Sequence, residues 1–198
     1  VDAVYKPRQG ERPLWDFPRA TLCNREYATF LVSEAIGWDL VPPTVLRDGP
    51  QGIGSVQLFI AHDPENHYFT FEGNPDYRPQ LQKIVLLDAM INNADRKGGH
   101  ILVEERPDSA VGRLWGIDHG LGFHIEYKLR TVVWEFAGDG IPPQQLQALQ
   151  DLAEKVAVNR EGIRSRLEAL LTKAEVEMFQ RRIAQLVDRG IFPTPGPG

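Results

Sequence analysis

Two short polar clusters hold the residues of this chain that are best suited to chemistry, and each follows an apolar segment. The first spans residues 92–100 and carries Asp95, and the second spans residues 117–120 and carries Asp118. A helix, the first loop, a hairpin and the second loop would bring the two carboxylates to one edge of a domain. One carboxylate could then accept a proton from a hydroxyl group while the other binds magnesium. Phosphoryl transfer needs both functions.

The composition is that of an ordinary globular protein, with 42% hydrophobic and 25% charged residues in a chain of 198. That length suits one large domain or two small lobes. A net charge of −5 argues against a nucleic-acid partner, because such proteins carry basic patches. No apolar stretch approaches ~18 residues, so we expect no membrane span. The single cysteine, Cys23, excludes an internal disulfide and favours a cytoplasmic location.

The first sixty residues combine strands with one helix. We expect a strand, a loop, a helix and two strands at residues 1–6, 7–18, 21–36, 41–46 and 55–60. Thr21 is the expected N-cap of the helix and Gly37 its end. The turn between the last two strands covers residues 47–52, which are rich in glycine and contain a proline. These residues predict a small β-rich N-lobe over residues 1–60.

The remainder is mostly helical and predicts a C-lobe over residues 61–192. We expect a polar loop at 62–77, a helix at 79–92, strands at 100–104 and 113–117, a loop at 118–140, and helices at 143–157, 160–171 and 173–188. Asp88 shares the helical spacing of the apolar residues Leu81, Ile84 and Ile91. Residues 193–198 contain only proline, glycine and threonine, so we expect a disordered tail.

With this order of elements the chain resembles proteins of the protein kinase-like fold. More narrowly, it is similar to the actinobacterial branch of phosphatidylinositol 3- and 4-kinase-like proteins. The motifs that carry the resemblance are Tyr5-Lys6-Pro7, Gly10-Glu11-Arg12-Pro13-Leu14-Trp15-Asp16-Phe17-Pro18, Arg25-Glu26, Val41-Pro42-Pro43-Thr44, Asn92-Asn93-Ala94-Asp95-Arg96-Lys97 and Ile117-Asp118-His119-Gly120. The resemblance implies an α+β, two-lobed fold of the phosphoinositide kinase and HipA type.

The resemblance also implies a role for each matching residue. Lys6 would hold the α- and β-phosphates of ATP, and Glu26 would orient Lys6. Asp95 would accept the proton of the acceptor hydroxyl, and Asp118 would bind the magnesium that bridges the phosphates. The strand and hinge that contact adenine would consist of Val56, Gln57, Leu58 and Phe59.

The chain departs from the family pattern at two places. His100 stands five residues after Asp95, where relatives usually have an asparagine that binds the second metal. Imidazole is a poor ligand for magnesium, so manganese is an alternative, as is a phosphate contact. No glycine-rich loop precedes Lys6, so we expect a truncated N-lobe, with native residues before Val1. A sheet that lacks strands at one edge invites dimerisation through that edge.

Every candidate residue also has a purely structural interpretation. Lys6 could be a solvated strand-end lysine, Glu26 an exposed helix carboxylate, and His100 the first residue of a strand. Asp95 and Asp118 could cap turns. Two classes of function remain: an ATP-dependent kinase acting on a hydroxyl of a protein, lipid or small molecule, or a non-catalytic pseudokinase that serves as a nucleotide-binding or interaction scaffold.

Overall fold

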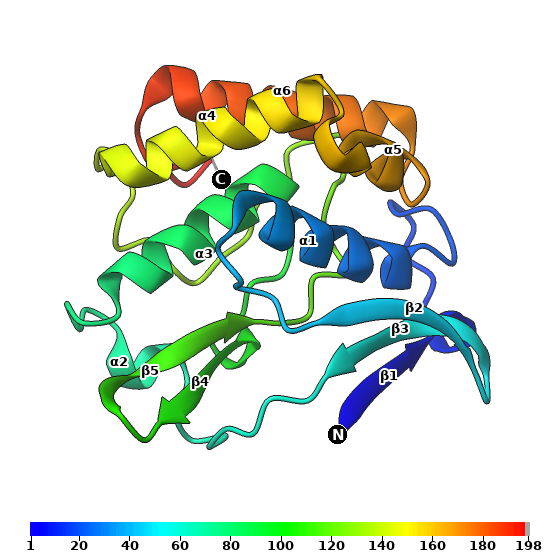
Figure 1. The fold of residues 1–198 in the computed structure, drawn as a ribbon, viewed down its shortest axis with the longest axis horizontal. Coiled ribbons are helices and arrows are strands. Elements are labelled where there is room, and N and C mark those ends of the chain that lie inside the picture. The colour runs from blue at the N-terminus through cyan, green and yellow to red at the C-terminus, as the bar shows by residue number, and fades with distance from the viewer. Residues whose placement is uncertain (197–198) are drawn as a thin grey trace.

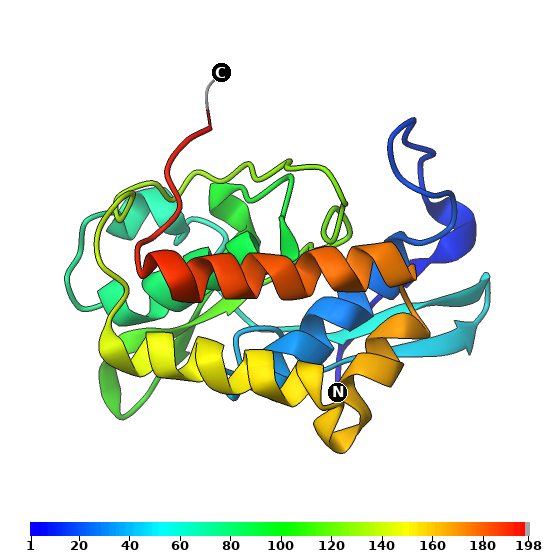
Figure 2. The ribbon, with the colours of Figure 1, turned by 90° about the horizontal axis from the view of Figure 1, so that it is seen from above.

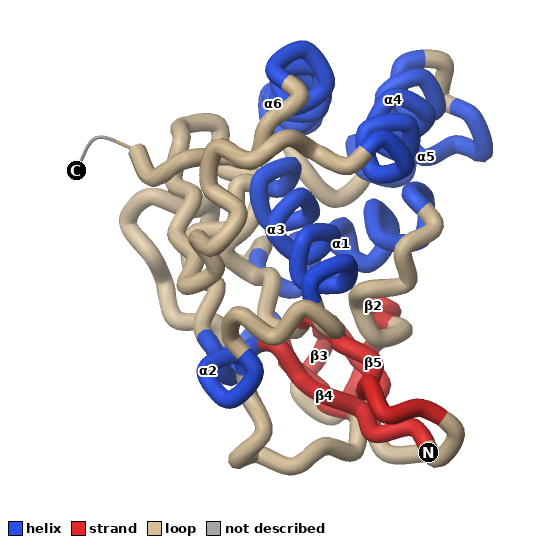
Figure 3. The backbone as a smooth tube through the Cα atoms, turned by 90° about the vertical axis from the view of Figure 1, so that its left-hand side faces the viewer, coloured by secondary structure: helices blue, strands red, loops and turns tan. Residues whose placement is uncertain are grey.

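The computed structural model describes residues 1–196 and arranges them in three layers (Figure 1). The strands are β1 (Ala3–Pro7), β2 (Thr44–Gly49), β3 (Gly52–Leu58), β4 (Ile101–Arg106) and β5 (Ser109–Gly116). The helices are α1 (Leu22–Ile36), α2 (Tyr68–Phe71), α3 (Arg78–Ile91), α4 (Pro143–Ala157), α5 (Ile163–Glu168) and α6 (Lys173–Arg189), with 3-10 turns at Arg8–Gly10, Gly98–His100 and Arg160–Gly162. Helices α4, α5 and α6 form one outer layer, α1 and α3 the middle layer, and two sheets the other outer layer (Figures 1 and 3).

The main hydrophobic core lies between the two helical layers. Side chains from four helices meet there, namely Leu31 of α1, Leu87 of α3, Leu152 of α4 and Phe179 of α6. Helices α4 and α6 lie side by side over the middle layer (Figure 2). Burial of each such side chain contributes about 1.5–3 kcal/mol. The core therefore gives a rigid base to the elements that face the sheets.

Helix α1 is buried on two sides because it lies between the core helices and the three-stranded sheet. Ala28 and Val32 are fully buried, and so is most of the charged side chain of Glu26. The helix ends at Gly37 with a φ of 73°, which confirms the predicted end. One helix thus packs on the core and also carries a carboxylate to the sheet.

The three-stranded sheet is antiparallel with the order β1-β3-β2. The predicted turn over residues 47–52 is wrong, because both strands continue until Gly49 pairs with Gly52. Only Pro50 and Gln51 remain between the strands. Gly52 has a φ of 84°, which a glycine adopts without steric cost. Strands β1 and β2 are the outer strands of this sheet, and dimerisation through such an edge stays a prediction.

Two further segments differ in secondary structure from what the sequence predicts. Residues 62–77 contain α2, whose Tyr68 and Phe71 are buried, so the segment is not only a polar surface loop. A four-residue helix is too short to show a helical period in the sequence. The expected helix at 160–171 is reduced to a 3-10 turn and α5, because Glu161 and Gly162 both have positive φ values. The helices expected at 143–157 and 173–188 are confirmed as α4 and α6.

Strands β4 and β5 form the expected hairpin, and the turn between them covers residues 107–108. None of the helices within residues 1–196 has the length and hydropathy that crossing a membrane would require. Residues 193–196 have no regular secondary structure, and the last two residues of the expected disordered tail lie outside the described residues. The lobe boundary near residue 60 and the disorder of the tail stay predictions.

Candidate functional site

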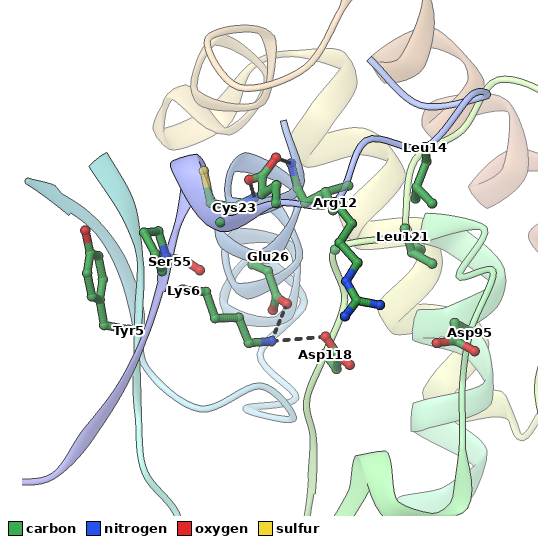
Figure 4. Close-up of a pocket in the computed structure, with 15 residues that line it drawn as sticks. Tyr5, Lys6, Arg12, Leu14, Cys23, Glu26, Ser55, Asp95, Asp118 and Leu121 are labelled. Atoms are coloured by element: carbon green, nitrogen blue, oxygen red, sulfur yellow. Dashed lines mark hydrogen bonds and ion pairs between the residues drawn. The ribbon is translucent and has the colours of Figure 1, made fainter. Parts of the chain in front are cut away.

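Lys6 lies at the centre of the site because β1 and α1 converge on it. On β1, Lys6 pairs with Ser55 of the central strand β3. Its Nζ atom donates to Glu26 Oε1 at 2.7 Å and to Asp118 Oδ1 at 3.0 Å (Figure 4). One ammonium group therefore joins the first strand, the first long helix and the loop that follows β5.

Burial and charge act in opposite directions on these three groups. Burial disfavours the Lys6 ammonium, but the two carboxylates outweigh that effect and the pKa of Lys6 is raised. Burial raises the pKa of Glu26, whose side chain is 5% exposed, although Lys6 opposes the change. Burial also disfavours the Asp118 carboxylate, but Lys6 prevails and lowers the pKa of Asp118. Lys6 and Asp118 are therefore charged at neutral pH, as phosphate and metal binding require.

The loop after β5 gives Asp118 a fixed position. Its φ is 60°, a left-handed conformation that aspartate tolerates better than most residues. The preceding amide, of Ile117, donates to His100 O at 3.0 Å. The following residue, His119, is fully buried and accepts from Arg96 Nη2 at 2.6 Å. Burial holds the pKa of His119 well below its usual value, so this ring is neutral and can accept.

The loop after α3 is held through its backbone, which leaves the Asp95 carboxylate available. Helix α3 ends at Asn92, whose φ is 56°. Asn93 accepts from Asp95 N at 3.1 Å and donates to Asp88 Oδ1 at 2.9 Å. The Asp95 side chain forms an ion pair of 2.9 Å with Lys97, and both side chains are more than a third exposed. The carboxylate is therefore not needed to shape the loop.

A buried ion pair ties the two loops together. Arg96 donates to both carboxylate oxygens of Asp88 at 2.8 Å, and both side chains are essentially inaccessible. The third nitrogen, Nη1, donates to the carbonyl oxygens of His100 and Ile117, each at 3.0 Å. The Asp95 loop, the start of β4 and the end of β5 thus share one arginine. The sequence contains one indication of this ion pair: Asp88 is a charged residue at a position where the spacing along α3 predicts an apolar one.

We expect Asp88→Ala to lower the free energy of unfolding by about 3–5 kcal/mol, because it leaves the Arg96 guanidinium buried without a counter-ion. Urea unfolding followed by circular dichroism would measure the change. Asp188→Ala is a suitable control, since Asp188 is an exposed aspartate on α6 and should matter little. A similar small change in both variants would contradict the structural role of the pair.

His100 connects the two loops on the side of the cavity. Its Nδ1 lies 3.0 Å from Asp95 O and its Nε2 lies 3.3 Å from Asp118 Oδ2. A carbonyl oxygen can only accept, so Nδ1 carries the proton. Burial lowers the pKa of His100, which keeps the ring neutral at pH 7 and leaves a lone pair on Nε2. This lone pair faces a carboxylate oxygen, and a cation between the two would be bound by both.

The Asp118 and His100 pair could supply two ligands to a metal ion, which is fewer than such an ion needs. Residues 1–196 contain no group of three or more histidine, cysteine, aspartate or glutamate side chains that could hold a metal ion. A divalent cation at this pair would need phosphate oxygens and water as its remaining ligands. Because one of the two protein donors is nitrogen, a transition metal such as Mn²⁺ suits the pair better than Mg²⁺ does.

A cavity of about 500 Å³ adjoins these groups. Lys6, Glu26, Asp95 and Asp118 line it together, as the resemblance implied. The rest of its lining consists of Tyr5, Pro7, Gly10, Glu11, Arg12, Leu14, Leu22, Cys23, Ser55, Gly120 and Leu121. His100 is not part of this lining and reaches the site through its contact with Asp118.

The residues expected to contact adenine are not brought to this cavity. Val56, Gln57, Leu58 and Phe59 occupy β3 and the residue after it, and none of them is among the lining residues. Gln57 is buried and donates to Thr44 Oγ1 at 2.9 Å. Leu58 packs against Ile60 in a separate apolar cluster. Their contact with adenine stays a prediction.

The capping role of Glu11 was not predicted, although the residue lies in the expected loop and in one of the motifs of the resemblance. The expected N-cap, Thr21, instead donates its hydroxyl to Pro18 O at 2.7 Å and leaves the helix end open. Glu11 occupies that place: its carboxylate accepts from Leu22 N at 3.1 Å and from Cys23 N at 2.8 Å. The sequence places Glu11 beside Arg12 in a loop of glycine and prolines, and that local pattern does not indicate a contact with α1.

Comparison with known proteins identifies the family. The sequence profile of "Phosphatidylinositol 3- and 4-kinase" matches residues 46–156. Protein Rv2133c of Mycobacterium tuberculosis is 39% identical, and the match covers 98% of this chain and 79% of that protein. The chain belongs to the phosphatidylinositol 3- and 4-kinase family. Phosphatidylinositol 4-kinase gamma 4 of rice is 30% identical, and the match covers 56% of this chain and 22% of the rice protein.

Solved structures show that this family member has the protein kinase-like fold. The Golgi casein kinase with Mn/ADP bound superposes with a TM-score of 0.63 at 17% identity, over 94% of this chain and 66% of that one. The Helicobacter pylori proinflammatory kinase CtkA gives a TM-score of 0.56 at 12% identity, over 96% and 83% of the two chains. At these identities the likeness concerns the fold alone. It confirms the expected α+β kinase-like architecture.

Proposed function

We propose that this chain is an ATP-dependent kinase that transfers phosphate to a hydroxyl group of a protein, lipid or small molecule. The observation that carries the proposal is the meeting of Lys6, Glu26, Asp95 and Asp118 around one cavity. Those four residues also occupy the family motifs at which a kinase needs a phosphate-binding lysine, its partner, a base and a metal ligand. The family and the fold support the same reading.

The phosphates of ATP would bind at the Lys6 end of the cavity. Lys6 would contact the α- and β-phosphates, and Glu26 would hold its ammonium group in place at the observed 2.7 Å. Asp118 and His100 would hold a divalent cation, either Mg²⁺ or Mn²⁺. When bound, such a cation would supply positive charge that offsets the charge of the phosphates. One structural relative, the Golgi casein kinase, was crystallised with Mn/ADP bound, which supports this assignment by analogy.

The acceptor hydroxyl would approach from the Asp95 side. Its oxygen attacks the γ-phosphorus while the bond from that phosphorus to the β-phosphate oxygen breaks, which releases ADP. The hydroxyl proton passes to the Asp95 carboxylate, which would otherwise hold only its exposed ion pair with Lys97. Asp95 is suited to this role because its backbone, not its side chain, fixes the loop.

Adenine would bind where β3 meets the β4–β5 hairpin, alongside residues 56–59. Support comes from a small apolar cluster there, formed by Ile60, Leu102 and Trp115 with Leu58 and Ile117 half-buried beside them. Ile117 directly precedes Asp118. A nucleotide whose adenine binds at this cluster would therefore have its phosphates directed towards the proposed metal ligand.

One observation favours the alternative of a pseudokinase, namely a histidine where relatives place a metal-binding asparagine. The transfer of labelled γ-phosphate from ATP separates the two functions. A kinase should transfer phosphate to an acceptor or to water in a reaction that depends on Mg²⁺ or Mn²⁺. Binding of ATP without any transfer, with both cations supplied, would favour the scaffold. Failure to bind ATP would reject the proposed kinase function.

We expect His100→Asn to shift the cation preference from Mn²⁺ towards Mg²⁺, because an amide oxygen replaces the Nε2 lone pair that faces Asp118. The ratio of nucleotide affinities with Mn²⁺ and with Mg²⁺ should fall by about tenfold, as for other changes beside a metal. Calorimetric titration with ADP would measure it. His62→Asn is the control, since His62 does not line the cavity. An unchanged ratio would remove His100 from the metal site.

Location and association also belong to this proposal. A lone buried cysteine, Cys23, suits a reducing cytoplasm, and no disulfide depends on it. Association of two chains through the β1 edge would extend the three-stranded sheet. Size-exclusion chromatography with light scattering would test the second point.

A further inference from the structure

Arg12 is the one basic residue besides Lys6 in the lining of the cavity. It belongs to the loop of residues 8–20, between β1 and α1, and its side chain is exposed. Figure 4 shows its guanidinium group extending into the space between Asp118 and Asp95. In the part of the chain that the structure describes, this guanidinium makes no hydrogen bond and no ion pair. Arg12 therefore reaches the site without a protein partner.

The loop that carries Arg12 is anchored on both sides. Before it, the Glu11 carboxylate accepts from two amides at the start of α1, at 2.8 and 3.1 Å. Arg8 Nη2 donates to Asn24 Oδ1 on the same helix at 2.9 Å. After it, Asp16 forms an ion pair of 2.8 Å with Lys128 of the segment that follows β5. The backbone of Arg12 is therefore fixed relative to Glu26 and Asp118, while its side chain stays free.

The charges of the cavity explain what a free guanidinium could bind. Four carboxylates line the cavity, and each already has a partner. Lys6 pairs with Glu26 and Asp118, and Lys97 pairs with Asp95. Glu11 accepts from the amides at the start of α1. The Arg12 guanidinium therefore remains available to bind an anion. A guanidinium binds phosphate oxygens in pairs through its planar fork, and such charge-assisted bonds are stronger than neutral ones.

We infer that Arg12 binds the terminal phosphate of the nucleotide and stabilises that group during transfer. This inference rests on the proposed kinase function. If the α- and β-phosphates lie at Lys6 and the acceptor lies at Asp95, the γ-phosphate lies between them. That is where Arg12 extends, so it would contact the γ-phosphate and not the rest of the nucleotide. The loop of residues 8–20 would then supply a phosphate contact from above the cavity.

The test compares ligands with and without a γ-phosphate. Calorimetric titrations with Mn²⁺ would use ADP and the β,γ-imido analogue of ATP on the wild type, Arg12→Ala, Arg12→Lys and Arg19→Ala. We expect Arg12→Ala to weaken the analogue by about tenfold or more, as loss of a charge-assisted hydrogen bond does, and to leave ADP within about twofold. Arg12→Lys should fall between, since lysine keeps the charge but loses the fork. Arg19→Ala removes an exposed arginine of the same loop outside the cavity and should change neither ligand.

Each outcome bears on one claim. Equal weakening of ADP and the analogue would overturn the assignment to the γ-phosphate, and so would unchanged affinity for both. If affinity stays constant while transfer needs more acceptor, Arg12 recognises an anionic acceptor instead, which also overturns the inference. A wild type that binds neither ligand would overturn the proposed function itself. Matching melting temperatures would show that Arg12→Ala is folded.

Discussion

Asp118→Asn should abolish the dependence of nucleotide binding on a divalent cation. Asparagine keeps the shape of the side chain and tolerates the φ of 60° at this position, whereas alanine would add backbone strain. The substitution removes the charge that faces both Lys6 Nζ, at 3.0 Å, and His100 Nε2, at 3.3 Å. A cation held by protein at only these two side chains would lose its anionic ligand. We expect affinity for the metal–nucleotide complex to fall by about 100-fold or more, at least as much as changes beside a metal ligand cost.

The measurement is a titration of ADP with and without Mn²⁺ on the wild type and the variant. Without the cation, the variant should bind ADP no more weakly than the wild type does, because a negative charge near the phosphates has been removed. Asp108→Asn, in the turn between β4 and β5, is the matched control, since Asp108 is exposed and does not line the cavity. A variant with full cation dependence would exclude Asp118 as the metal ligand.

The expected stability of Asp118→Asn follows from its surroundings. The Asp118 side chain is 48% exposed, so its ion pair with Lys6 contributes little to folding. The loop is held instead by Arg96 and by the buried ring of His119. Loss of binding without loss of the folded state is therefore the expected combination.

The resemblance to a known family was enough to predict the fold, because its motifs occur together and in the family's order along the chain. The fold and the family are confirmed. The four side chains from positions 6, 26, 95 and 118 lie around one cavity, while their chemical roles stay predictions. These four residues could be predicted together because each lies in a motif of the resembled family, within or just after an expected strand or helix.

The contacts that position these side chains were not predictable in the same way. Glu11 caps α1 from outside the helix, and local propensity favoured Thr21. The Asp88–Arg96 pair joins a helix to a loop, so a local sequence pattern does not reveal that these two residues contact each other. The position of the Arg12 side chain could not be predicted either, because a loop rich in proline and glycine has no periodic pattern that indicates where its side chains point. Long-range contacts of this kind decide where a side chain points.

Asp95→Asn should lower the rate of phosphoryl transfer by about 10²–10⁴-fold, which is the usual contribution of a positioned general base. Asparagine cannot take the hydroxyl proton. The loop should keep its shape, because the contact that fixes it runs from the backbone amide of residue 95 to Asn93 Oδ1. The ion pair with Lys97 that is also lost is solvent-exposed and contributes little. ATP affinity should stay nearly constant, since the base faces the acceptor.

Single-turnover transfer of labelled phosphate at saturating ATP would isolate this step from binding. Asp139→Asn is a matched control because Asp139 forms an exposed ion pair with Arg78 away from the cavity, and its rate should equal that of the wild type. Equal transfer rates in the wild type and in Asp95→Asn would contradict the assignment of Asp95 as the general base. A wild type that binds ATP but transfers no phosphate, even with Mn²⁺, would be a pseudokinase. The same carboxylate therefore decides between the two functions that the sequence left open.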